Sequence, residues 1–264
     1  MKILLTGHLG FIGSHMLQAL DGHDVKTFEW GEDEDKLDTR DRDVCIHMGA
    51  ISSTTEQDVD KVMRQNYDFS CRLLDRCMNT GTHFQYSSSA SVYGLNLEFR
   101  EDSPVDPRTP YAWSKYMFER YALKRQEFAE HVGDRIQGFR YFNVYGPAGE
   151  EHKGNQASPF AQFKKQTDAT GEIRLFENSE HYLRDFVHVS QVVNTHLKFF
   201  KVKESGIWNV GTGTTMSFRA VAETFNANIV DIPMPDVLKS SYQSYTCADI
   251  TKLSTTISKV NYDS

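Results

Sequence analysis

The chain has 264 residues, of which 39% are hydrophobic and 25% are charged, and its formal net charge is −7. This composition is typical of a folded globular protein, and the length predicts one large domain or a domain with a small additional lobe. The negative charge argues against a nucleic-acid partner, because a phosphate backbone attracts a basic surface.

The first segment and the cysteines indicate the expected environment. No apolar stretch approaches the ~20 residues that a membrane-spanning helix needs. Residues 1–5 resemble a buried strand rather than a signal peptide. No C-x-x-C pair or zinc-ligand spacing is formed by the four cysteines, Cys45, Cys71, Cys77 and Cys247. We therefore expect a cytoplasmic protein with free thiols, no metal site and no membrane partner.

The first 30 residues predict a strand, a glycine-rich turn, a helix and a second strand. The first strand spans 2–5, and the helix begins near Phe11. Its apolar residues recur at helical spacing, at Ile12, Met16, Leu17 and Leu20. The second strand spans 24–30 and is followed by an acidic loop at 32–35.

Strands and helices continue to alternate up to Pro147. Strands are expected at 43–50, 83–88 and 137–145. A capping box at Ser53–Glu56 predicts the start of a helix that runs to about Asn79 and ends at Gly81. A second long helix is expected over 111–131. This alternation predicts an α/β fold with a doubly wound parallel sheet, whose ligands bind beyond the carboxyl ends of the strands.

Three glycines in the first turn, Gly7, Gly10 and Gly13, form G-x-x-G-x-x-G between a strand and a helix. Glycine lets the backbone turn tightly and approach a pyrophosphate, whose charge the helix amides then meet. We therefore predict a dinucleotide-binding domain over 1–147. Residues 148–264 are expected to form mainly a substrate-binding lobe, with short strands near 184–189 and 207–211 that return to the first domain.

Two side chains after the second strand bear on which dinucleotide binds. Glu29 stands about 20 residues after the turn, where a carboxylate accepts hydrogen bonds from the adenosine ribose and favours NAD. Lys36 follows and is able to meet the 2′-phosphate of NADP, although a solvated loop lysine is an equal interpretation.

Tyr111 and Lys115 place a phenol and an ammonium on one face of the predicted helix, at positions i and i+4. A tyrosine with a pKa of ~10 is a poor base, and a nearby cation lowers that pKa. Serines 87–89 end the preceding strand and are able to hold a substrate oxygen. The pattern Y-x-x-x-K alone occurs often by chance. Its position after the glycine turn and the serines strengthens the interpretation that Tyr111 and Lys115 are functional.

These motifs resemble the extended short-chain dehydrogenase/reductase family, in its nucleotide-sugar epimerase and dehydratase branch. Residues 87–94 resemble the S-S-A-T-V-Y-G strand end of that branch, and Ser89 falls on its catalytic serine. Dehydratases carry Asp-Glu where this chain has Ala90 and Ser91, which argues against dehydration. The resemblance implies a Rossmann fold with a small C-terminal substrate lobe.

Longer strings resemble the ADP-L-glycero-D-manno-heptose 6-epimerases, from residue 1 to about Leu253. They lie at 49–56, 138–147, 152–154, 175–177, 184–187 and 241–243. The resemblance implies inversion at C6″ of an ADP-glycero-manno-heptose by hydride transfer to and from a nicotinamide dinucleotide. The implied catalytic residues are Ser89, Tyr111, Lys115 and Lys153. Lys36 matches a family lysine, so the resemblance favours NADP over NAD.

The resemblance also implies two sets of contacts. The implied cofactor-binding residues are Gly7, Gly10, Phe11, Ile12, Gly13, Glu29, Trp30, Lys36, Met48, Gly49, Ala50, Ser52, Asn66, Tyr111, Lys115 and Val144. The implied substrate-binding residues are Ser89, Asn143, Asn155, Gln162, Phe176, Glu177, Asn178, Ser179, Arg184 and Tyr242. Arg184 suits a diphosphate, although it is also able to pair with Asp185.

This chain departs from the family pattern at several positions. The segment between Trp30 and Asp43 is short, so a strand and a helix near the adenine pocket are expected to be missing. The chain ends at Ser264, without the family's last helix. Asn155 and Gln162 replace a serine and a histidine of the sugar site, which leaves open a sugar or a base other than the family's.

Two other functions stay open from the sequence. A UDP-hexose 4-epimerase would need a single tyrosine, because its keto-sugar turns over in the pocket. A dinucleotide-binding scaffold without turnover would not need Ser89, Tyr111 and Lys115. A homo-oligomer is also expected, and an exposed apolar face on a helix over 54–78 would suit it unless that face packs in the core.

Overall fold

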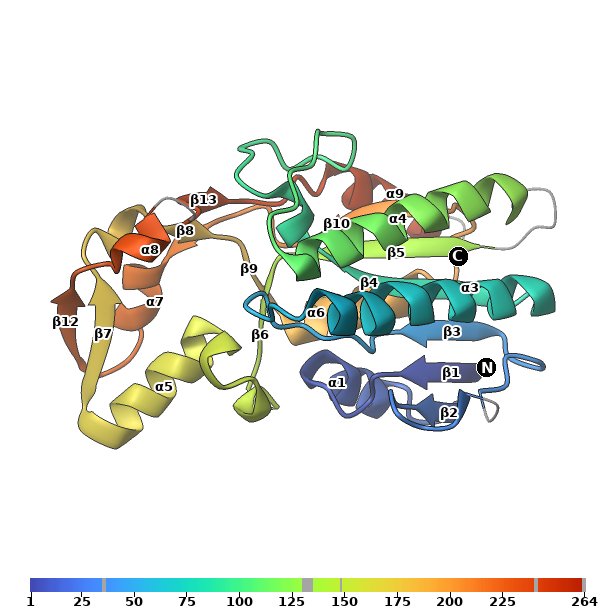
Figure 1. The fold of residues 1–264 in the computed structure, drawn as a ribbon, viewed down its shortest axis with the longest axis horizontal. Helices are drawn as coiled ribbons and strands as arrows, with labels where there is room; N and C mark the ends of the chain where they lie inside the picture. Colours follow the sequence, from blue (N-terminus) through green and yellow to red (C-terminus); the bar gives the residue numbers. More distant parts are fainter. Residues whose placement is uncertain (35–36, 130–134, 148, 240–241, 263–264) are drawn as a thin grey trace.

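The computed structural model describes residues 1–34, 37–129, 135–147, 149–239 and 242–262, and its largest element is a six-stranded parallel sheet (Figure 1). The strands lie in the order β10-β5-β4-β3-β1-β2. Their bounds are β1 Lys2–Thr6, β2 Asp24–Phe28, β3 Val44–His47, β4 His83–Ser89, β5 Ile136–Tyr141 and β10 Gly206–Val210. The predicted doubly wound α/β fold is confirmed.

Helices cover both faces of this sheet, as the alternation of strands and helices predicts. One face is covered by α3 (Phe69–Thr80) and α4 (Pro110–Ala129). The other is covered by α1 (Phe11–Ala19), α6 (Val189–Lys198) and α9 (Thr251–Tyr262). Because successive side chains of a strand point to opposite faces, Leu4 packs under α3 and its neighbours Ile3 and Leu5 pack under α1. The middle of β1, which is buried on both faces, is therefore apolar.

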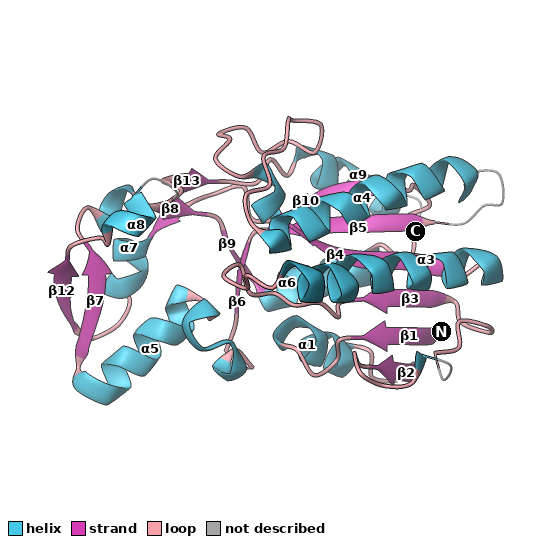
Figure 2. Cartoon of the chain, in the orientation of Figure 1, coloured by secondary structure: helices cyan, strands magenta, loops and turns pink. Residues whose placement is uncertain are grey.

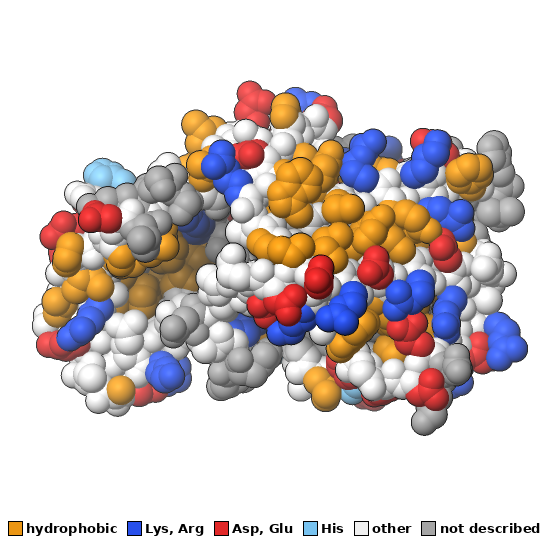
Figure 3. Space-filling view, viewed as in Figure 1, with side chains coloured by type: hydrophobic (Ala, Val, Ile, Leu, Met, Phe, Trp, Pro, Cys, Tyr) orange, Lys and Arg blue, Asp and Glu red, His pale blue; other side chains and the backbone are white. Residues whose placement is uncertain are grey.

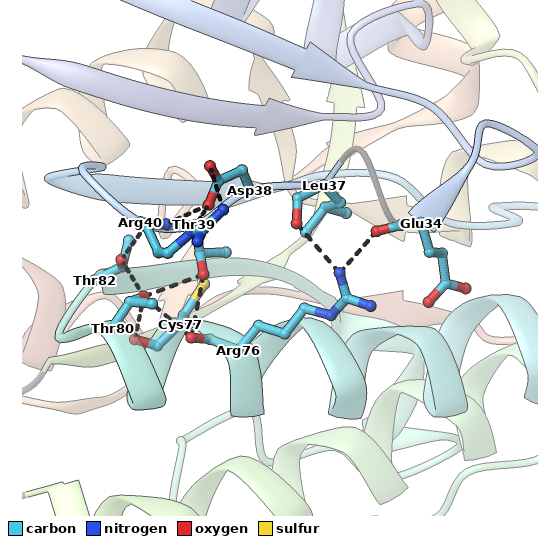
Figure 4. A network of polar contacts seen from close by, with 9 residues as sticks. All are labelled: Glu34, Leu37, Asp38, Thr39, Arg40, Arg76, Cys77, Thr80 and Thr82. Carbon is cyan, nitrogen blue, oxygen red and sulfur yellow. Dashed lines mark hydrogen bonds and ion pairs between the residues drawn. The ribbon is translucent and has the colours of Figure 1, made fainter.

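The outer edge of the sheet is shortened after β2, which confirms the predicted loss of a strand. The usual order places one more strand beyond the second, but residues 29–34 and 37–43 form no strand that joins this sheet. They are bound to α3 instead (Figure 4). Arg76 Nη1 donates to the carbonyls of Glu34 at 2.7 Å and of Leu37 at 3.2 Å, and Thr39 Oγ1 donates to the carbonyl of Arg76 at 3.2 Å.

The helix predicted from the capping box begins later than expected. Asp58 caps α2 (Val59–Val62) by accepting from the Lys61 amide at 2.9 Å. The proposed capping residue Ser53 instead contacts the Thr55 hydroxyl at 3.1 Å. The chain continues through the π-helical turn η2 (Met63–Asp68) into α3, which ends at Gly81 as predicted, with φ +69°.

The expected strand over 137–145 is two strands. β5 ends at Tyr141, and the amide of Phe142 bonds to the carbonyl of Val210. β6 (Asn143–Tyr145) then leaves the main sheet and pairs with β9 (Phe186–His188). Of the two short strands expected to return to the first domain, β10 joins its sheet and β9 does not, because β9 pairs with β6 at the exit from the sheet.

The remaining elements build a second, smaller body of short helices and strands (Figures 1 and 2). They are the 3₁₀ turn η4 Glu151–Gln156, α5 Pro159–Thr170, β7 Glu172–Phe176, η5 Ser179–His181, β8 Leu183–Arg184, β11 Met216–Ser217, α7 Phe218–Glu223, β12 Asn228–Ile232, α8 Asp236–Lys239 and β13 Tyr245–Thr246. This body contains two small sheets, β12-β7 and β11-β8-β13, and its core includes Phe163 of α5 and Ile173 and Leu175 of β7.

One carboxylate ties the junction of the two bodies together. Asp185 is fully buried between β8 and β9. It accepts from the Thr212 amide and hydroxyl, the Gly213 amide and the Ala248 amide, at 2.7–3.1 Å. Three chain segments therefore meet on one side chain.

Candidate active site

The glycine-rich turn forms a tight cradle at the carboxyl end of β1. Gly7 has φ +76°, and a Cβ there would lie 2.4 Å from the Gly49 amide nitrogen. A Cβ on Gly13 would lie 1.9 Å from the Gly7 carbonyl oxygen. Gly10 caps α1, whose first turn carries no acidic residue. The free amides and positive end of α1 therefore suit a pyrophosphate.

A cavity of about 130 Å³ continues from this turn towards β2. Five of the predicted cofactor residues line it together with Gln65 and Phe69, which were not predicted; the five are Gly7, Glu29, Trp30, Gly49 and Ala50. Glu29 Oε1 accepts from the Leu9 amide at 2.7 Å and lies 3.1 Å from His8 Nδ1. Trp30 is half exposed and packs edge-on against Phe69. The cavity suits the adenosine half of a dinucleotide.

Other predicted cofactor residues lie around this cleft rather than in the cavity. Asn66 is buried, and its amide bonds to both main-chain groups of Ile51 and to Ser114 Oγ. It therefore supports the loop after β3. Ile12 and Val144 pack against one core cluster, Met48 packs against another, and Ser52 is exposed. Lys36 lies outside the described residues.

Ser89, Tyr111 and Lys115 meet where β4 ends and α4 begins. The Thr109 hydroxyl accepts from the Ala112 amide, and Pro110 opens the helix, so Tyr111 lies in its first turn. Lys115 Nζ lies 5.8 Å from the centroid of the Tyr111 ring and donates to the Ser87 carbonyl at 2.9 Å. The predicted trio is therefore brought together.

The expected lowering of the Tyr111 pKa by Lys115 is not present in the protein alone. Burial raises the pKa of Tyr111, and a hydrogen bond with Ser89 opposes that rise. Burial also lowers the pKa of Lys115 to about 8, against the effect of Glu119. The phenolate therefore needs a further positive charge, which an oxidised nicotinamide ring would supply.

Lys153 lies in η4, on the other side of the glycine-rich turn. Its ammonium is 4.5 Å from the centroid of the Phe11 ring. Burial lowers the pKa of Lys153, and Glu150 opposes that shift. Glu150 is itself buried and accepts from the Ser158 amide at 2.6 Å and hydroxyl at 2.7 Å, which closes the base of the loop. The structure therefore shields this lysine partly from bulk solvent.

A cavity of about 510 Å³ lies in the second body. Four predicted substrate residues line it, Gln162, Phe176, Ser179 and Tyr242. Ser179 is buried, and within the described ranges its hydroxyl has no hydrogen-bond partner. Arg174, Tyr182 and Phe218 also line the cavity and were missed. The sequence signal for Arg174 was the alternation of polar and apolar residues along β7.

Arg184 lies next to this cavity and does not pair with Asp185, whose oxygens accept from other groups. Its guanidinium lies 5.4 Å from the Phe218 ring and 5.5 Å from the Tyr242 ring, and donates to the carbonyls of Leu183 and Gln243. Burial lowers the pKa of Arg184. No carboxylate among the described side chains forms an ion pair with it, so it suits an anionic ligand.

Besides Ser89 and Arg184, four predicted substrate residues lie outside the cavity lining. Asn143 lies on β6, and its amide bonds to the carbonyl of Asp185. Glu177 and Asn178 are exposed, and Asn178 opens η5 with φ +62°. The side chain of Asn155 lies outside the described part of the structure.

The described residues contain neither a metal-binding cluster nor a membrane-spanning helix. No group of three or more His, Cys, Asp or Glu side chains is arranged to hold a metal ion. Every helix in these ranges is too short or too polar to cross a membrane.

A Rossmann sheet with a glycine-rich turn and a Ser–Tyr–Lys trio at its carboxyl edge defines an extended short-chain dehydrogenase/reductase fold. The chain belongs to the NAD-dependent epimerase/dehydratase family, whose model matches residues 3–211.

Solved structures with the same fold include enzymes of several activities. ADP-L-glycero-D-manno-heptose-6-epimerase from Helicobacter pylori has a TM-score of 0.85 and 24% identity, covering 97% of this chain and 90% of that chain. UDP-N-acetylglucosamine 4-epimerase from Methanobrevibacter ruminantium has a TM-score of 0.84 and 24% identity, covering 97% and 91%. An NAD-dependent NDP-hexosamine 5,6-dehydratase of tunicamycin biosynthesis has a TM-score of 0.81 and 25% identity, covering 97% and 90%.

Proposed function

We propose that this chain is a nucleotide-sugar epimerase that inverts C6″ of an ADP-glycero-manno-heptose. A bound nicotinamide dinucleotide would take up a hydride from the carbinol carbon and return it to the opposite face. Each face then needs its own acid–base group for the hydroxyl proton. The single observation that supports this choice is Lys153, a shielded ammonium above Phe11, in addition to Tyr111.

Each residue of the trio has a proposed part in the reaction. Tyr111 takes the hydroxyl proton on one face of the sugar and returns it there. Ser89, which bonds to Tyr111, holds the substrate oxygen. Lys115 binds the nicotinamide ribose and stabilises the phenolate. Lys153 gives and takes the hydroxyl proton on the other face of the sugar. Burial favours this role because it lowers the pKa of Lys153.

The nucleotide is proposed to occupy the 510 Å³ cavity. Phe176 and Tyr242 offer aromatic surfaces to a base, and the hydroxyl of Ser179 has a free hydrogen-bonding position. Arg184 is proposed to bind the diphosphate through its planar guanidinium.

We propose NADP as the dinucleotide, on the resemblance that includes Lys36, with NAD as the alternative. The structure gives NAD some support, because Glu29 Oε1 is bound to the Leu9 amide and its other oxygen is able to accept from a ribose hydroxyl. Mass spectrometry of the purified protein identifies which dinucleotide copurifies.

The proposed substrate is tested with a panel of nucleotide sugars and one variant. Turnover of ADP-glycero-manno-heptose with inversion at C6″ is expected, and Lys153→Ala should nearly abolish it. Turnover only on UDP-hexoses, with a mild effect of Lys153→Ala, would replace this assignment with a one-tyrosine 4-epimerase. Absence of any bindable nicotinamide dinucleotide would contradict an enzymatic function altogether.

We also propose that the chain forms a homo-oligomer through α4 and the helical segment before α3. The apolar residues of α3 pack in the core, so the exposed part of the expected face over 54–78 lies before α3, at Val59. Exposed apolar side chains lie at Val59, Trp113 and Met117, and Figure 3 shows an apolar band over this side of the molecule. Light scattering of the protein and of Trp113→Glu tests this proposal, which a monomeric parent protein would contradict.

A further inference from the structure

A row of hydrogen-bonded polar side chains crosses the core behind the Ser–Tyr–Lys trio. Tyr141 OH lies 3.1 Å from Ser87 Oγ and 2.5 Å from His196 Nε2. His196 Nδ1 lies 2.8 Å from Gln85 Oε1. His196 and Gln85 are fully buried, and Tyr141 is buried at the carboxyl end of β5. The row therefore joins α6 to β4 and β5.

The partners fix the direction of these hydrogen bonds. Gln85 Nε2 donates to the carbonyl of His196 at 3.2 Å, so Gln85 Oε1 accepts from His196 Nδ1. Burial lowers the pKa of His196 to about 3, so the ring is neutral and its Nε2 is an acceptor. Tyr141 must then donate to His196 and accept from Ser87 Oγ.

Ser87 connects this row to Lys115. Its carbonyl accepts from Lys115 Nζ at 2.9 Å, while its hydroxyl bonds to Tyr141. β4 and β5 are already paired through their backbones at this point. Burying a polar row against Phe139, 4.3 Å from His196 between ring centroids, carries a desolvation penalty that the sheet itself does not require.

We propose that Tyr141 and His196 are positioning residues that fix Ser87, and through it the Lys115 ammonium, relative to Tyr111. This inference rests on the proposed epimerase function, in which Lys115 stabilises the Tyr111 phenolate. The ionisable groups that face this region are Tyr111 and Glu119 on α4, His47 on β3, His83 on β4, His196 on α6, and Tyr141 itself. Because Lys115 binds the main-chain carbonyl of Ser87, loss of the Tyr141 hydroxyl acts on Lys115 by letting the end of β4 shift, once the Ser87 side chain is no longer held.

The test is Tyr141→Phe, which keeps the ring and removes only the hydroxyl. The readout is the titration of Tyr111 in dinucleotide-loaded protein, followed by tyrosinate absorbance as a difference from the matching Tyr111→Phe protein. We expect the Tyr111 pKa to rise by about one unit in Tyr141→Phe, with about a tenfold lower kcat at neutral pH and an unchanged KM.

His83→Gln is the matched control. His83 lies in the same buried row, where its Nε2 is 2.7 Å from Gln137 Oε1, but at the far end of β4 from Ser87. A purely structural row predicts similar losses of melting temperature in both variants and no change in the Tyr111 titration in either. That result would overturn the inference.

A second pair of variants decides the matter if Tyr141→Phe does not fold. His196→Gln keeps an acceptor for Tyr141 and a donor for Gln85, whereas His196→Leu keeps neither. The titration should stay near that of the parent protein in His196→Gln and shift in His196→Leu, and equal titrations would contradict the inference. A normal titration in protein that turns over no nucleotide sugar would instead contradict the proposed function alone.

Discussion

Lys153 differs from an ordinary loop lysine because its ammonium faces Phe11 and is shielded from solvent. Lys153→Arg separates charge from acid–base chemistry, since a guanidinium stays protonated with a pKa above ~12. We expect kcat for epimerisation to fall by at least about 100-fold, within the range of general acid–base contributions, while KM changes little. Steady-state kinetics measure both constants.

Lys164→Arg is the control for that experiment. Lys164 is an exposed lysine of α5 that pairs with Asp168 at 2.8 Å. Its replacement should leave both constants unchanged. A Lys153→Arg protein with the parent kcat would exclude Lys153 as an acid or base.

Arg184 is expected to contribute to binding rather than to the chemical step. Arg184→Gln keeps a polar side chain but loses the charge that a diphosphate needs. Because charge-assisted bidentate bonds are strong, we expect the Kd for a nucleoside diphosphate to rise by about 10- to 100-fold, by ~1.4 kcal/mol per tenfold. Calorimetric titration measures it, and Arg219→Gln, which removes an exposed partner of Asp231, should have no effect.

At the scale of single elements, the turn between β1 and α1 tolerates no added methyl group at Gly13. A Cβ there would lie 1.9 Å from the Gly7 carbonyl oxygen. Gly13→Ala should therefore destabilise the fold by about 1–3 kcal/mol and abolish dinucleotide binding, as measured by thermal unfolding and NAD(P)H fluorescence. Gly22→Ala is the control, because Gly22 also has a positive φ, +84°, but open space around it. Equal binding by both variants would contradict a phosphate cradle at this turn.

Patterns within a short stretch of sequence predicted the helices whose formation depends on neighbouring residues. The apolar periodicity from Phe11 gave α1, and the i, i+4 spacing of Tyr111 and Lys115 placed both on α4. The capping box at 53–56 failed because Glu56 is bound instead to the Lys61 ammonium and the Asp58 amide, and Asp58 supplies the cap. Two capping patterns lay close together, and only tertiary structure selects between them.

The second-body cavity was less predictable than the glycine turn. Its lining comes from α5, β7, η5, α7, α8 and the segment before β13, which are far apart in the sequence. The four-residue and shorter elements among them carry too little periodicity to predict. Gln162, Phe176, Ser179 and Tyr242 were found through the family resemblance, and Arg174 and Phe218 were found only when the chain was folded.

For the whole molecule, three buried histidines make stability depend on pH. Burial lowers the pKa of His47, His83 and His196 from 6.5 to about 3. The unfolded chain binds protons at these rings below pH ~6.5 and the folded chain does not, so stability falls with falling pH. Between about pH 7.5 and pH 5 each ring should lower the free energy of unfolding by about 2 kcal/mol.

Urea unfolding at the two pH values measures this loss. His83→Gln should reduce the difference by about one third, because one of the three protonation sites is gone. A free energy of unfolding that is independent of pH over this interval would show that the three rings are already charged or solvated in the native state.

The cluster of donors on Asp185 has a consequence for how the molecule opens. A single carboxylate accepts hydrogen bonds from three backbone amides and a hydroxyl of separate segments. We therefore expect the junction between the two bodies to be rigid rather than a hinge. Asp185→Asn turns two acceptors into one, and small-angle scattering should show a wider spread of shapes for that variant than for the parent chain.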